Sequence, residues 1–334
     1  MSTTTKTLGT SKSSPVRWGF VGTGNIAASM AGVVSTTPAA RLCAVASRDI
    51  SKAQSFAVEH GAERAFDSWV EMLAWENLDA VYVATPTSLR EEVSIAAARA
   101  GKHVLGEKPF ASLPSLKRIT AACRENGVSF MDATHFVHHP RYAAIQHGAR
   151  EMIGEPRSLD TRFLISLTDR GNIRYNPTLE PLGAIGDLGW YNMRATLEYL
   201  APEASLRTAT TQLQRDAATG IITAGEGSLT FDDDSVSRWQ CSFNAVSADI
   251  GLALTGSLGV LQMDNFIGED ENHAASYRYA EESDVSVASV LSGPALMFED
   301  FAAAVRDASL REHWMQASER TQALLDAALA AADT

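Results

Sequence analysis

The chain has 334 residues and a formal net charge of −12, and 45% of its residues are hydrophobic while 20% are charged. This composition is typical of a folded protein of about two domains and excludes a chain that is disordered throughout. Because the excess charge is negative and Lys and Arg do not cluster, we expect no nucleic-acid partner. The longest uncharged stretch, Trp18 to Ala40, is broken by glycines and a proline, so it predicts a strand, a turn and a helix rather than a membrane span.

The N-terminus and the cysteines indicate where the protein works. Residues 1–15 are rich in Ser and Thr and lack the apolar segment of a secretory signal, so we expect a short disordered tail. Cys43, Cys123 and Cys241 are odd in number and have neither metal-ligand spacing nor the pattern of a disulfide framework. They predict buried free thiols in a reducing compartment, which favours a cytoplasmic protein.

Short apolar runs alternate with helical patterns in the first part of the chain. Strands are predicted over residues 16–21, 41–46, 79–84, 103–105 and 128–131, and helices ending near residue 34 and over 51–60, 69–75, 89–100 and 115–126. Glycines at 61, 101 and 127 suit the C-terminal caps of three of these helices. The rhythm predicts βαβ units in a doubly wound parallel sheet, an α/β domain over residues 16–136.

A glycine loop connects the first predicted strand to the first helix. The pattern Gly22-x-Gly24-x-x-Ala27 has the placement of a dinucleotide fingerprint, in which the first glycine allows the turn and the second lets the backbone approach a pyrophosphate. The helix N-terminus then offers free N–H groups to the phosphates. The cofactor-binding residues predicted here are Gly22, Thr23, Gly24, Asn25 and Ile26.

The end of the second predicted strand distinguishes between the two nicotinamide cofactors. An acidic residue there would bind the ribose 2′-hydroxyl of NAD, whereas an arginine accommodates the 2′-phosphate of NADP. This chain has Ser47 and Arg48, which suit a phosphate and favour NADP. The alternative is that Arg48 is solvated and that Asp49 binds the ribose instead.

Several motifs together resemble one enzyme family. A predicted strand runs into Gly106-Glu107-Lys108-Pro109, and this resembles the Gfo/Idh/MocA oxidoreductases. Supporting matches lie at residues 82–87, at 153–156 and in the run from Gly183 to Tyr191. The matches extend from about residue 16 to about residue 200, and the remainder is only compatible with the family.

The resemblance implies a second domain, over residues 137–334, of α/β type with a large, open, mainly antiparallel sheet. In this family the free face of that sheet often packs against another subunit, so a homo-oligomer is expected. The residue patterns of the second half agree. They predict strands over 157–167, 221–231, 236–243, 250–255 and 260–263, and helices over 187–200, 296–308 and 318–332.

The resemblance also assigns the chemistry. It implies that Lys108 is catalytic, that Pro109 follows a cis peptide bond, and that the loops at the strand ends bind cofactor. The cofactor-binding residues that it adds are Thr85, Pro86, Glu107 and Lys108. Hydride transfer at a carbinol carbon needs a group that moves the hydroxyl proton and a positive charge near the developing alkoxide.

Asp187 and Tyr191 complete the predicted catalytic set. They are four residues apart, which places them on one face of a helix. Many family members carry His where this chain has Tyr191, and the tyrosine version resembles the NADP-favouring branch that contains dihydrodiol dehydrogenases, glucose–fructose oxidoreductases and nucleotide-ketosugar reductases. A phenol titrates near 10, so Tyr191 would need Lys108 nearby. The alternatives are a core tyrosine and, for Asp187, a helix N-cap.

Three further residues are candidates for substrate contact. His135 lies where the chain enters the second domain, Arg174 lies in the polar loop 169–181, and Trp190 adjoins Tyr191. His135, His138 and His139 have no acidic or Cys ligand close in sequence, and the family uses no metal, so no metal is expected.

The sequence therefore predicts an NADP-dependent oxidoreductase acting on a sugar, polyol, cyclic diol or related carbonyl compound. In this mechanism Tyr191 moves the proton, Lys108 supplies positive charge and Asp187 orients the substrate. One alternative is a nucleotide-linked ketosugar reductase, because the stretch His138-His139-Pro140 and the residue Tyr191 also resemble that group. The other, of a different class, is a sensor that binds NADP without catalysis.

Overall fold

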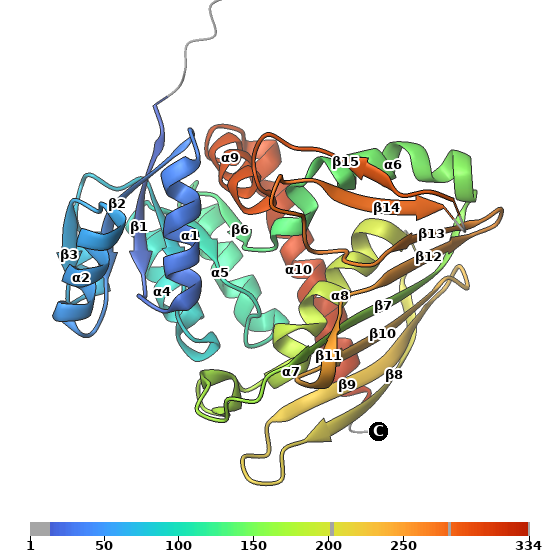
Figure 1. Cartoon of the computed structure of the whole chain (residues 1–334). Helices are drawn as coiled ribbons and strands as arrows, with labels where there is room; N and C mark the ends of the chain where they lie inside the picture. Colours follow the sequence, from blue (N-terminus) through green and yellow to red (C-terminus); the bar gives the residue numbers. More distant parts are fainter. Residues whose placement is uncertain (1–13, 201–203, 280–281, 333–334) are drawn as a thin grey trace, which may run out of the picture.

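Two β-sheets lie side by side in the molecule, with helices packed on and between them (Figure 1). The computed structural model describes residues 14–200, 204–279 and 282–332. The predicted tail, except for its last two residues, lies outside the described residues. In the described part of the chain, no helix is both long and apolar enough to cross a membrane.

The first sheet has six parallel strands in the order β3-β2-β1-β4-β5-β6, so the predicted doubly wound fold is confirmed. Its elements are β1 (Val16–Val21), α1 (Asn25–Thr36), β2 (Ala40–Ala46), α2 (Ile50–His60), β3 (Arg64–Phe66), α3 (Trp69–Leu73), β4 (Ala80–Val83), α4 (Thr87–Arg99), β5 (His103–Gly106), α5 (Leu113–Glu125) and β6 (Phe130–Asp132). The three predicted cap glycines all have positive φ. The sequence analysis missed β3, which has only three residues.

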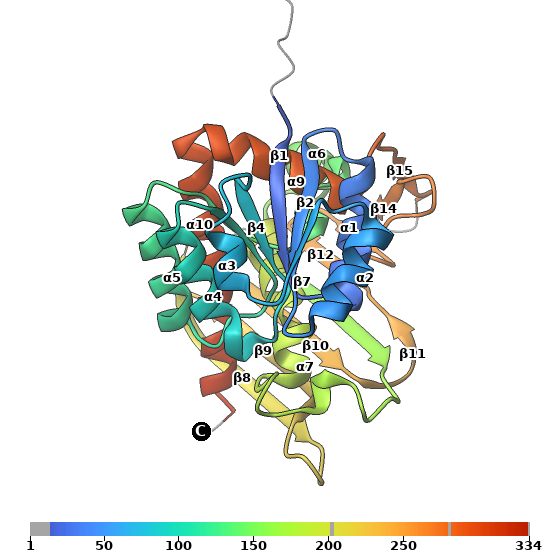
Figure 2. The ribbon, with the colours of Figure 1, turned by 90° about the vertical axis from the view of Figure 1, so that its left-hand side faces the viewer.

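Helices cover both faces of this sheet (Figure 2). Helices α1 and α2 pack on one face and α3, α4 and α5 on the other. The face of α1 is also covered by α9 (Gly293–Arg306), although α9 lies far along the chain: the ring of Trp18 is 5.0 Å from that of Phe298 and 4.8 Å from that of Phe301. The domain boundary near residue 136 stays a prediction, and α9 crosses back over it.

The second sheet has the order β15-β14-β13-β12-β7-β10-β9-β8, with β11 beside β7. Among the described strands of this sheet, β7 and β10 alone pair in parallel, so the predicted mainly antiparallel sheet is confirmed. Its strands are β7 (Pro156–Ser166), β8 (Leu206–Arg215), β9 (Ile222–Phe231), β10 (Val236–Ser242), β11 (Asn244–Asp249), β12 (Leu252–Gly256), β13 (Val260–Met263), β14 (Ala275–Tyr279) and β15 (Val285–Val287). Strands β8, β11, β14 and β15 were not predicted.

The remaining elements join the sheets and cover one face of the second. They are η1 (His135–His138), α6 (Pro140–Ile153), η2 (Ile173–Tyr175), α7 (Gly183–Asp187), α8 (Gly189–Ala195), the π-helical turn η3 (Thr196–Leu200) and α10 (Ala308–Ala330). Helix α10 contacts β6 and α5 on one side and α8 on the other, so it lies between the two parts (Figure 1). Helix α6 was not predicted, and α10 begins ten residues before the predicted start.

The predicted helix over 187–200 is wrong in its start and its continuity. The helical segment begins at Gly183, whose φ is +52°, and breaks at Leu188 between α7 and α8. Glycine at 189 lets the two short helices meet closely, since a Cβ there would lie 3.1 Å from Ile185 Cγ1. Asp187 is the last residue of α7, so it is not a helix N-cap.

Candidate active site

The structure brings the three predicted catalytic residues together at the carboxyl edge of the parallel sheet. Lys108 follows β5, while Asp187 and Tyr191 come from α7 and α8. The Lys108 Nζ lies 2.7 Å from Asp187 Oδ1 and 2.9 Å from the Asp187 carbonyl oxygen. It also lies 4.8 Å from the centre of the Tyr191 ring. The peptide bond between Lys108 and Pro109 is cis, as the resemblance implied.

Asp187 is held between two cations. Its Oδ1 accepts a hydrogen bond from Lys108, and its Oδ2 accepts one from Arg174 Nε at 2.5 Å. Burial would raise the pKa of Asp187, but the charges of Lys108 and Arg174 outweigh burial and hold this pKa well below its usual range. Burial likewise opposes the charge on Lys108, but the Asp187 carboxylate raises the Lys108 pKa. Asp187 and Lys108 are therefore a charged pair at neutral pH.

Tyr191 is a neutral phenol in an aromatic setting. Burial raises the pKa of Tyr191 to about 12, although the nearby Lys108 charge lowers it. The Phe163 ring, from β7, lies 5.3 Å from the Tyr191 ring, and the His135 ring lies 6.1 Å from it. Burial, together with the charges of His138 and Lys108, lowers the pKa of His135 to about 4, so this imidazole is neutral near pH 7.

Glu107 is a buried carboxylate beside Lys108. The Tyr82 hydroxyl donates a hydrogen bond to Glu107 Oε1, and the Lys108 backbone N–H lies 3.3 Å from Oε2. Sequence analysis did not single out Tyr82 as the partner of Glu107. A polar residue in an otherwise apolar strand, 25 positions from a motif glutamate, was the available signal.

The glycine loop has the shape that a bound pyrophosphate requires. Gly22 has φ +113°, and a Cβ there would lie 2.9 Å from the Ala84 carbonyl oxygen. Gly24 is the N-cap of α1, and a Cβ there would meet nothing within 4 Å, so the space in front of the helix is open. The first turn of α1 has no acidic side chain and its N-cap makes no side-chain hydrogen bond, which leaves N–H groups for an anion.

The residues after β2 distinguish between the two alternatives for the cofactor ribose, which are Arg48 on a 2′-phosphate and Asp49 on a 2′-hydroxyl. Asp49 caps α2, because its Oδ1 accepts hydrogen bonds from the backbone N–H groups of Ser51 at 3.0 Å and Lys52 at 3.3 Å. Arg48 is exposed and forms no hydrogen bond or ion pair with any part of the chain that the structure describes. Between the glycine loop and α2 lies a cavity of about 310 Å³ that Thr23, Ser51 and Lys52 help to line. A free guanidinium and a capping carboxylate fit a 2′-phosphate better than a 2′-hydroxyl.

Like the Arg48 guanidinium, a hydroxyl in the loop after β4 has no hydrogen-bond partner in the described part of the chain. The Thr85 hydroxyl is buried and has no hydrogen-bond partner among the described residues. Pro86, the next residue, is the N-cap of α4. Buried hydroxyls are normally satisfied, so Thr85 fits a contact with a bound dinucleotide at the strand end.

The three candidate substrate residues lie differently. The His135 ring lies beside the Tyr191 ring, and Arg174 donates a hydrogen bond to Asp187. Trp190 is fully buried, and its Nε1 donates a hydrogen bond of 2.7 Å to Thr134 Oγ1, so it packs in the core. His138 lies 2.6 Å from an Asp300 oxygen. In the described ranges no group of three or more His, Cys, Asp or Glu side chains is placed to hold a metal ion.

The fold and this site together define a dinucleotide-dependent oxidoreductase. A family model described as an oxidoreductase family with an NAD-binding Rossmann fold matches residues 16–134. D-xylose 1-dehydrogenase (NADP(+)) 2 from Haloferax volcanii is 30% identical over 275 residues, which cover 80% of this chain and 82% of that protein. The chain belongs to the Gfo/Idh/MocA family of oxidoreductases, so the predicted family is confirmed.

Two further similarities lie on the sugar-nucleotide side of the family. The dTDP-3,4-didehydro-2,6-dideoxy-alpha-D-glucose 3-reductase of Streptomyces violaceoruber is 32% identical over 265 residues, 77% of this chain and 75% of that one. The crystal structure of KijD10, a 3-ketoreductase from Actinomadura kijaniata in complex with NADP and TDP-benzene, matches with a TM-score of 0.86 and 27% identity. It covers 95% of this chain and 98% of that one. These relatives bear out the predicted oxidoreductase class and NADP as its cofactor.

Proposed function

We propose that the protein transfers a hydride between NADP(H) and a carbon of a sugar, polyol, cyclic diol or related carbonyl compound. One observation carries this proposal: the Lys108 ammonium, paired with Asp187, lies 4.8 Å from the Tyr191 ring at the carboxyl edge of the parallel sheet. In open α/β sheets that edge is where ligands bind.

Each residue has a defined task. The Tyr191 phenol is neutral and so can donate a proton to a carbonyl oxygen as it becomes an alkoxide. Lys108 places a positive charge beside the phenol, which stabilises the phenolate that remains. Asp187 holds Lys108 in place and orients substrate hydroxyls. The nicotinamide, when bound, supplies or accepts the hydride.

The same residues that fit a dinucleotide would hold NADP. In that case the N–H groups at the α1 N-terminus would bind the pyrophosphate, Arg48 and Ser47 would bind the 2′-phosphate, and the Thr85 hydroxyl would form a hydrogen bond to the dinucleotide. The names of relatives, D-xylose 1-dehydrogenase (NADP(+)) 2 and scyllo-inositol 2-dehydrogenase (NADP(+)), support this choice.

A nucleotide-linked ketosugar is the second candidate substrate. It is favoured by the similarity to dTDP-ketosugar 3-reductases and to KijD10 with TDP-benzene. Arg174 is also half-exposed at the site, where a cation could meet a diphosphate.

The test is an NADP(H)-linked screen over aldoses, cyclitols, anhydrosugars, diols, diketones and a dTDP-linked ketosugar. We expect turnover with NADPH or NADP⁺ that the Tyr191→Phe variant largely loses while it still binds NADPH. Turnover that is unchanged in this variant would contradict the proposal. Activity on free sugars alone would exclude the nucleotide-sugar substrate, and no cofactor consumption with any compound would favour the sensor.

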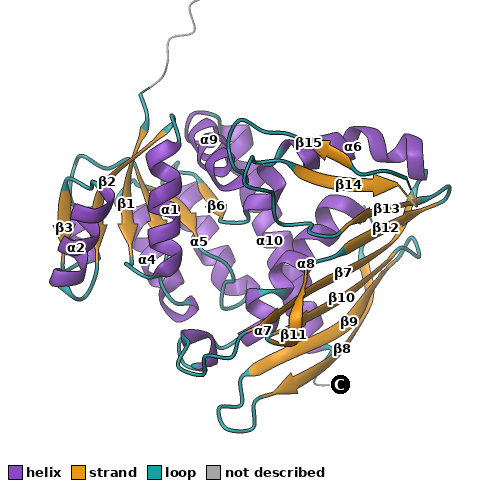
Figure 3. Ribbon diagram, viewed as in Figure 1, coloured by secondary structure: helices purple, strands orange, loops and turns teal. Residues whose placement is uncertain are grey.

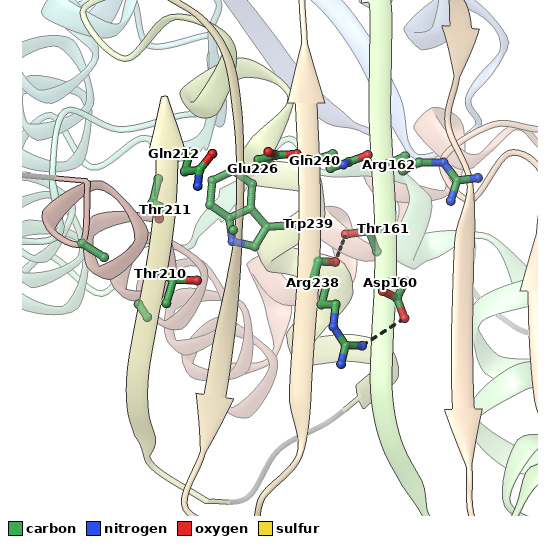
Figure 4. A pocket seen from close by; sticks show the side chains of 13 residues that line it. Asp160, Thr161, Arg162, Thr210, Thr211, Gln212, Glu226, Arg238, Trp239 and Gln240 are labelled. Atoms are coloured by element: carbon green, nitrogen blue, oxygen red, sulfur yellow. Dashed lines mark hydrogen bonds and ion pairs between the residues drawn. The ribbon is translucent and has the colours of Figure 1, made fainter. Parts of the chain in front are cut away.

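We also propose that the protein is a homo-oligomer through the outer face of the second sheet. Figure 4 shows polar side chains side by side across four strands, in the row Gln212, Glu226, Gln240 and Arg162. They line a hollow of about 590 Å³, and Arg238 pairs with Asp160 at 3.5 Å along its edge. Mixed charges suit an isologous contact between two copies.

Light scattering would test the assembly: a mass above one chain is expected, with dissociation on Arg238→Glu and none on Arg118→Glu, which lies on α5. A monomeric protein would contradict it. A cytoplasmic location remains a prediction from the composition and the three buried free cysteines.

A further inference from the structure

Arg90 is a buried cation that no step of the proposed reaction uses. It lies in the first turns of α4, and only 8% of its side chain is exposed. A guanidinium at such a depth is costly unless its donors are bonded and its charge is paired. The contacts of Arg90 therefore show what its burial achieves.

The guanidinium of Arg90 joins two loops of the active site. Its Nε donates to the Thr85 carbonyl oxygen at 3.0 Å, in the loop after β4. Its Nη1 donates to Thr87 Oγ1 at 2.7 Å and to the Pro109 carbonyl oxygen. Pro109 directly follows Lys108, so the Arg90 guanidinium connects the loop after β4, which carries Thr85, to the backbone that carries the catalytic lysine.

The partner of Arg90 comes from the other half of the molecule. Glu180 lies 3.6 Å from Arg90 Nη2 and accepts hydrogen bonds from the Thr87 N–H at 3.1 Å and the Thr87 hydroxyl at 2.5 Å. It belongs to the loop between β7 and α7, which also carries Arg174 (Figure 3). The Ser88 N–H donates to the Leu179 carbonyl oxygen at 3.2 Å, so this loop is attached to the start of α4 at two points.

We propose that Arg90 and Glu180 form a positioning pair that aligns Lys108 with Asp187 and Tyr191. Arg90, on a helix that packs against the parallel sheet, fixes the backbone beside Lys108. Glu180, in the second half of the chain, fixes the loop that places Arg174 beside Asp187. The inference rests on the proposed function, because it assumes that Lys108 and Tyr191 carry the chemistry. Neither member of the pair is itself a catalytic residue, since neither is in contact with Lys108 Nζ or the Tyr191 hydroxyl.

A conservative change separates positioning from charge. Arg90→Lys keeps the positive charge but cannot bond acceptors on two loops at once, as the planar guanidinium does. The Lys108 ammonium would then be held less closely to Tyr191, and its lowering of the Tyr191 pKa would weaken. In the direction of alcohol oxidation, where the phenolate is the base, the pH at half-maximal kcat would move upward.

The experiment compares Arg90→Lys and Glu180→Gln with the wild type and with two matched controls. The controls are Arg118→Lys and Glu91→Gln, since Arg118 and Glu91 form a partly exposed ion pair at 2.5 Å between α5 and α4. The probe is NADP⁺ with whichever of D-xylose, scyllo-inositol or trans-1,2-dihydrobenzene-1,2-diol reacts fastest, these being named for relatives. The measurements are kcat, KM, the pH profile, NADPH affinity by fluorescence, and Tm.

We expect Arg90→Lys to lower kcat by about 10- to 100-fold, the range in which misplaced catalytic groups fall. The pH profile should shift upward, and NADPH affinity should change by a smaller factor than kcat, because Arg48 and the α1 N-terminus are untouched and only the loop with Thr85 loses a hydrogen bond. For Glu180→Gln we expect the same loss of kcat and the same upward shift of the pH profile. The change in log kcat should be at least about a third of that in Arg90→Lys. Both controls should match the wild type.

An unchanged kcat and pH profile in both test variants overturns the positioning role. If Arg90→Lys fails to fold, Glu180→Gln decides, because it keeps the size and shape of the side chain while it removes the charge and one of the two oxygens that accept hydrogen bonds from Thr87. Full activity of Tyr191→Phe would instead overturn the proposed function and the positioning role with it. Loss of activity in Tyr191→Phe with unaffected Arg90→Lys overturns the positioning role alone.

Discussion

Asp187 at the site and Asp132 in the core are both paired with basic side chains, yet the surroundings of the two carboxylates differ. Asp187 is bonded to Lys108 and Arg174, and the Arg174 side chain is 44% exposed. Asp132, at the end of β6, is bonded to Arg194 Nη1 at 3.0 Å and to Ser318 Oγ at 2.5 Å. The side chains of Asp132 and Arg194 are at most 1% exposed.

The difference separates a functional ion pair from a structural one. In the core, Thr134 also donates to Asp132 and accepts from Trp190, so the partners of the buried charge form a closed network around α8. At the site, one of the two cations is a half-exposed arginine on a loop, and the Tyr191 phenol lies beside the other. The core pair holds the helix that carries Tyr191, and in the reaction we propose the site pair would present charge to a substrate.

The largest expected effect is at the site. Replacing Lys108 with Met should lower kcat by about 10³-fold, because both the proton transfer and the stabilisation of developing negative charge lose their cation. The Tm should change little, since Asp187 keeps Arg174 as its partner. Steady-state kinetics and calorimetry measure the two quantities. A kcat within tenfold of the wild type would remove Lys108 from the mechanism.

In the core the expected effect is on stability. Asp132→Asn removes one of the two carboxylates that pair with the buried Arg194, the other being Glu198 at 2.8 Å, and such a loss costs about 2 kcal/mol in the free energy of unfolding. Urea denaturation measures this cost. The double variant Asp132→Asn with Arg194→Met should recover part of it, because the fully buried cation is then removed as well and Glu198, which loses Arg194, is partly exposed. A cost below about 1 kcal/mol would mean that the pair of Asp132 and Arg194 contributes little to the stability of the fold.

Arg48 extends the comparison to a cation without any carboxylate. Arg48→Gln should weaken NADPH binding by about 10- to 100-fold, the equivalent of one charged hydrogen-bonding group. NADH binding should remain as in the wild type, because NADH lacks the 2′-phosphate. Fluorescence titration with both cofactors provides the measurement and its own control. Equal losses for the two cofactors would place Arg48 elsewhere than at the 2′-phosphate.

The smallest effect is in the pH dependence of stability. The Asp187 pKa is depressed in the folded state, so its stabilising contribution is complete above the unfolded value near 3.8 and is lost as the pH falls through the lower, folded value. The wild type should therefore lose unfolding free energy more steeply below about pH 4 than Asp187→Asn does. Denaturation at pH 3, 4, 5 and 7 tests this. Identical slopes in the two proteins would show that the pair is broken in solution.

The sequence predicted the first sheet better than the second for a physical reason. Strands buried on both faces, such as β1 and β4, are continuous apolar runs that stand out from their surroundings. Strand β8 is rich in Thr, Gln and Arg and has no fully buried residue, so it resembles a loop. Pairing with β9, which no local pattern encodes, makes it a strand.

The same contrast holds for the site. Lys108 and Tyr191 lie in motifs, so a resemblance locates them. Asp49 could have been assigned as the cap of α2 from its place before a helical pattern. Arg90 and Glu180 are 90 positions apart and meet only through the folded chain, so no local pattern could pair them.

The packing of α9 on the first sheet has a consequence for how the protein is made. Trp18 is fully buried beneath Phe298 and Phe301, although some 280 residues of chain separate them. During synthesis the first strands leave the ribosome long before the helix that shields them. A truncated gene product that ends after β6 would leave the apolar surface around Trp18 uncovered and prone to aggregate. The dinucleotide-binding half is continuous in sequence, but it is complete only once nearly the whole chain has been translated.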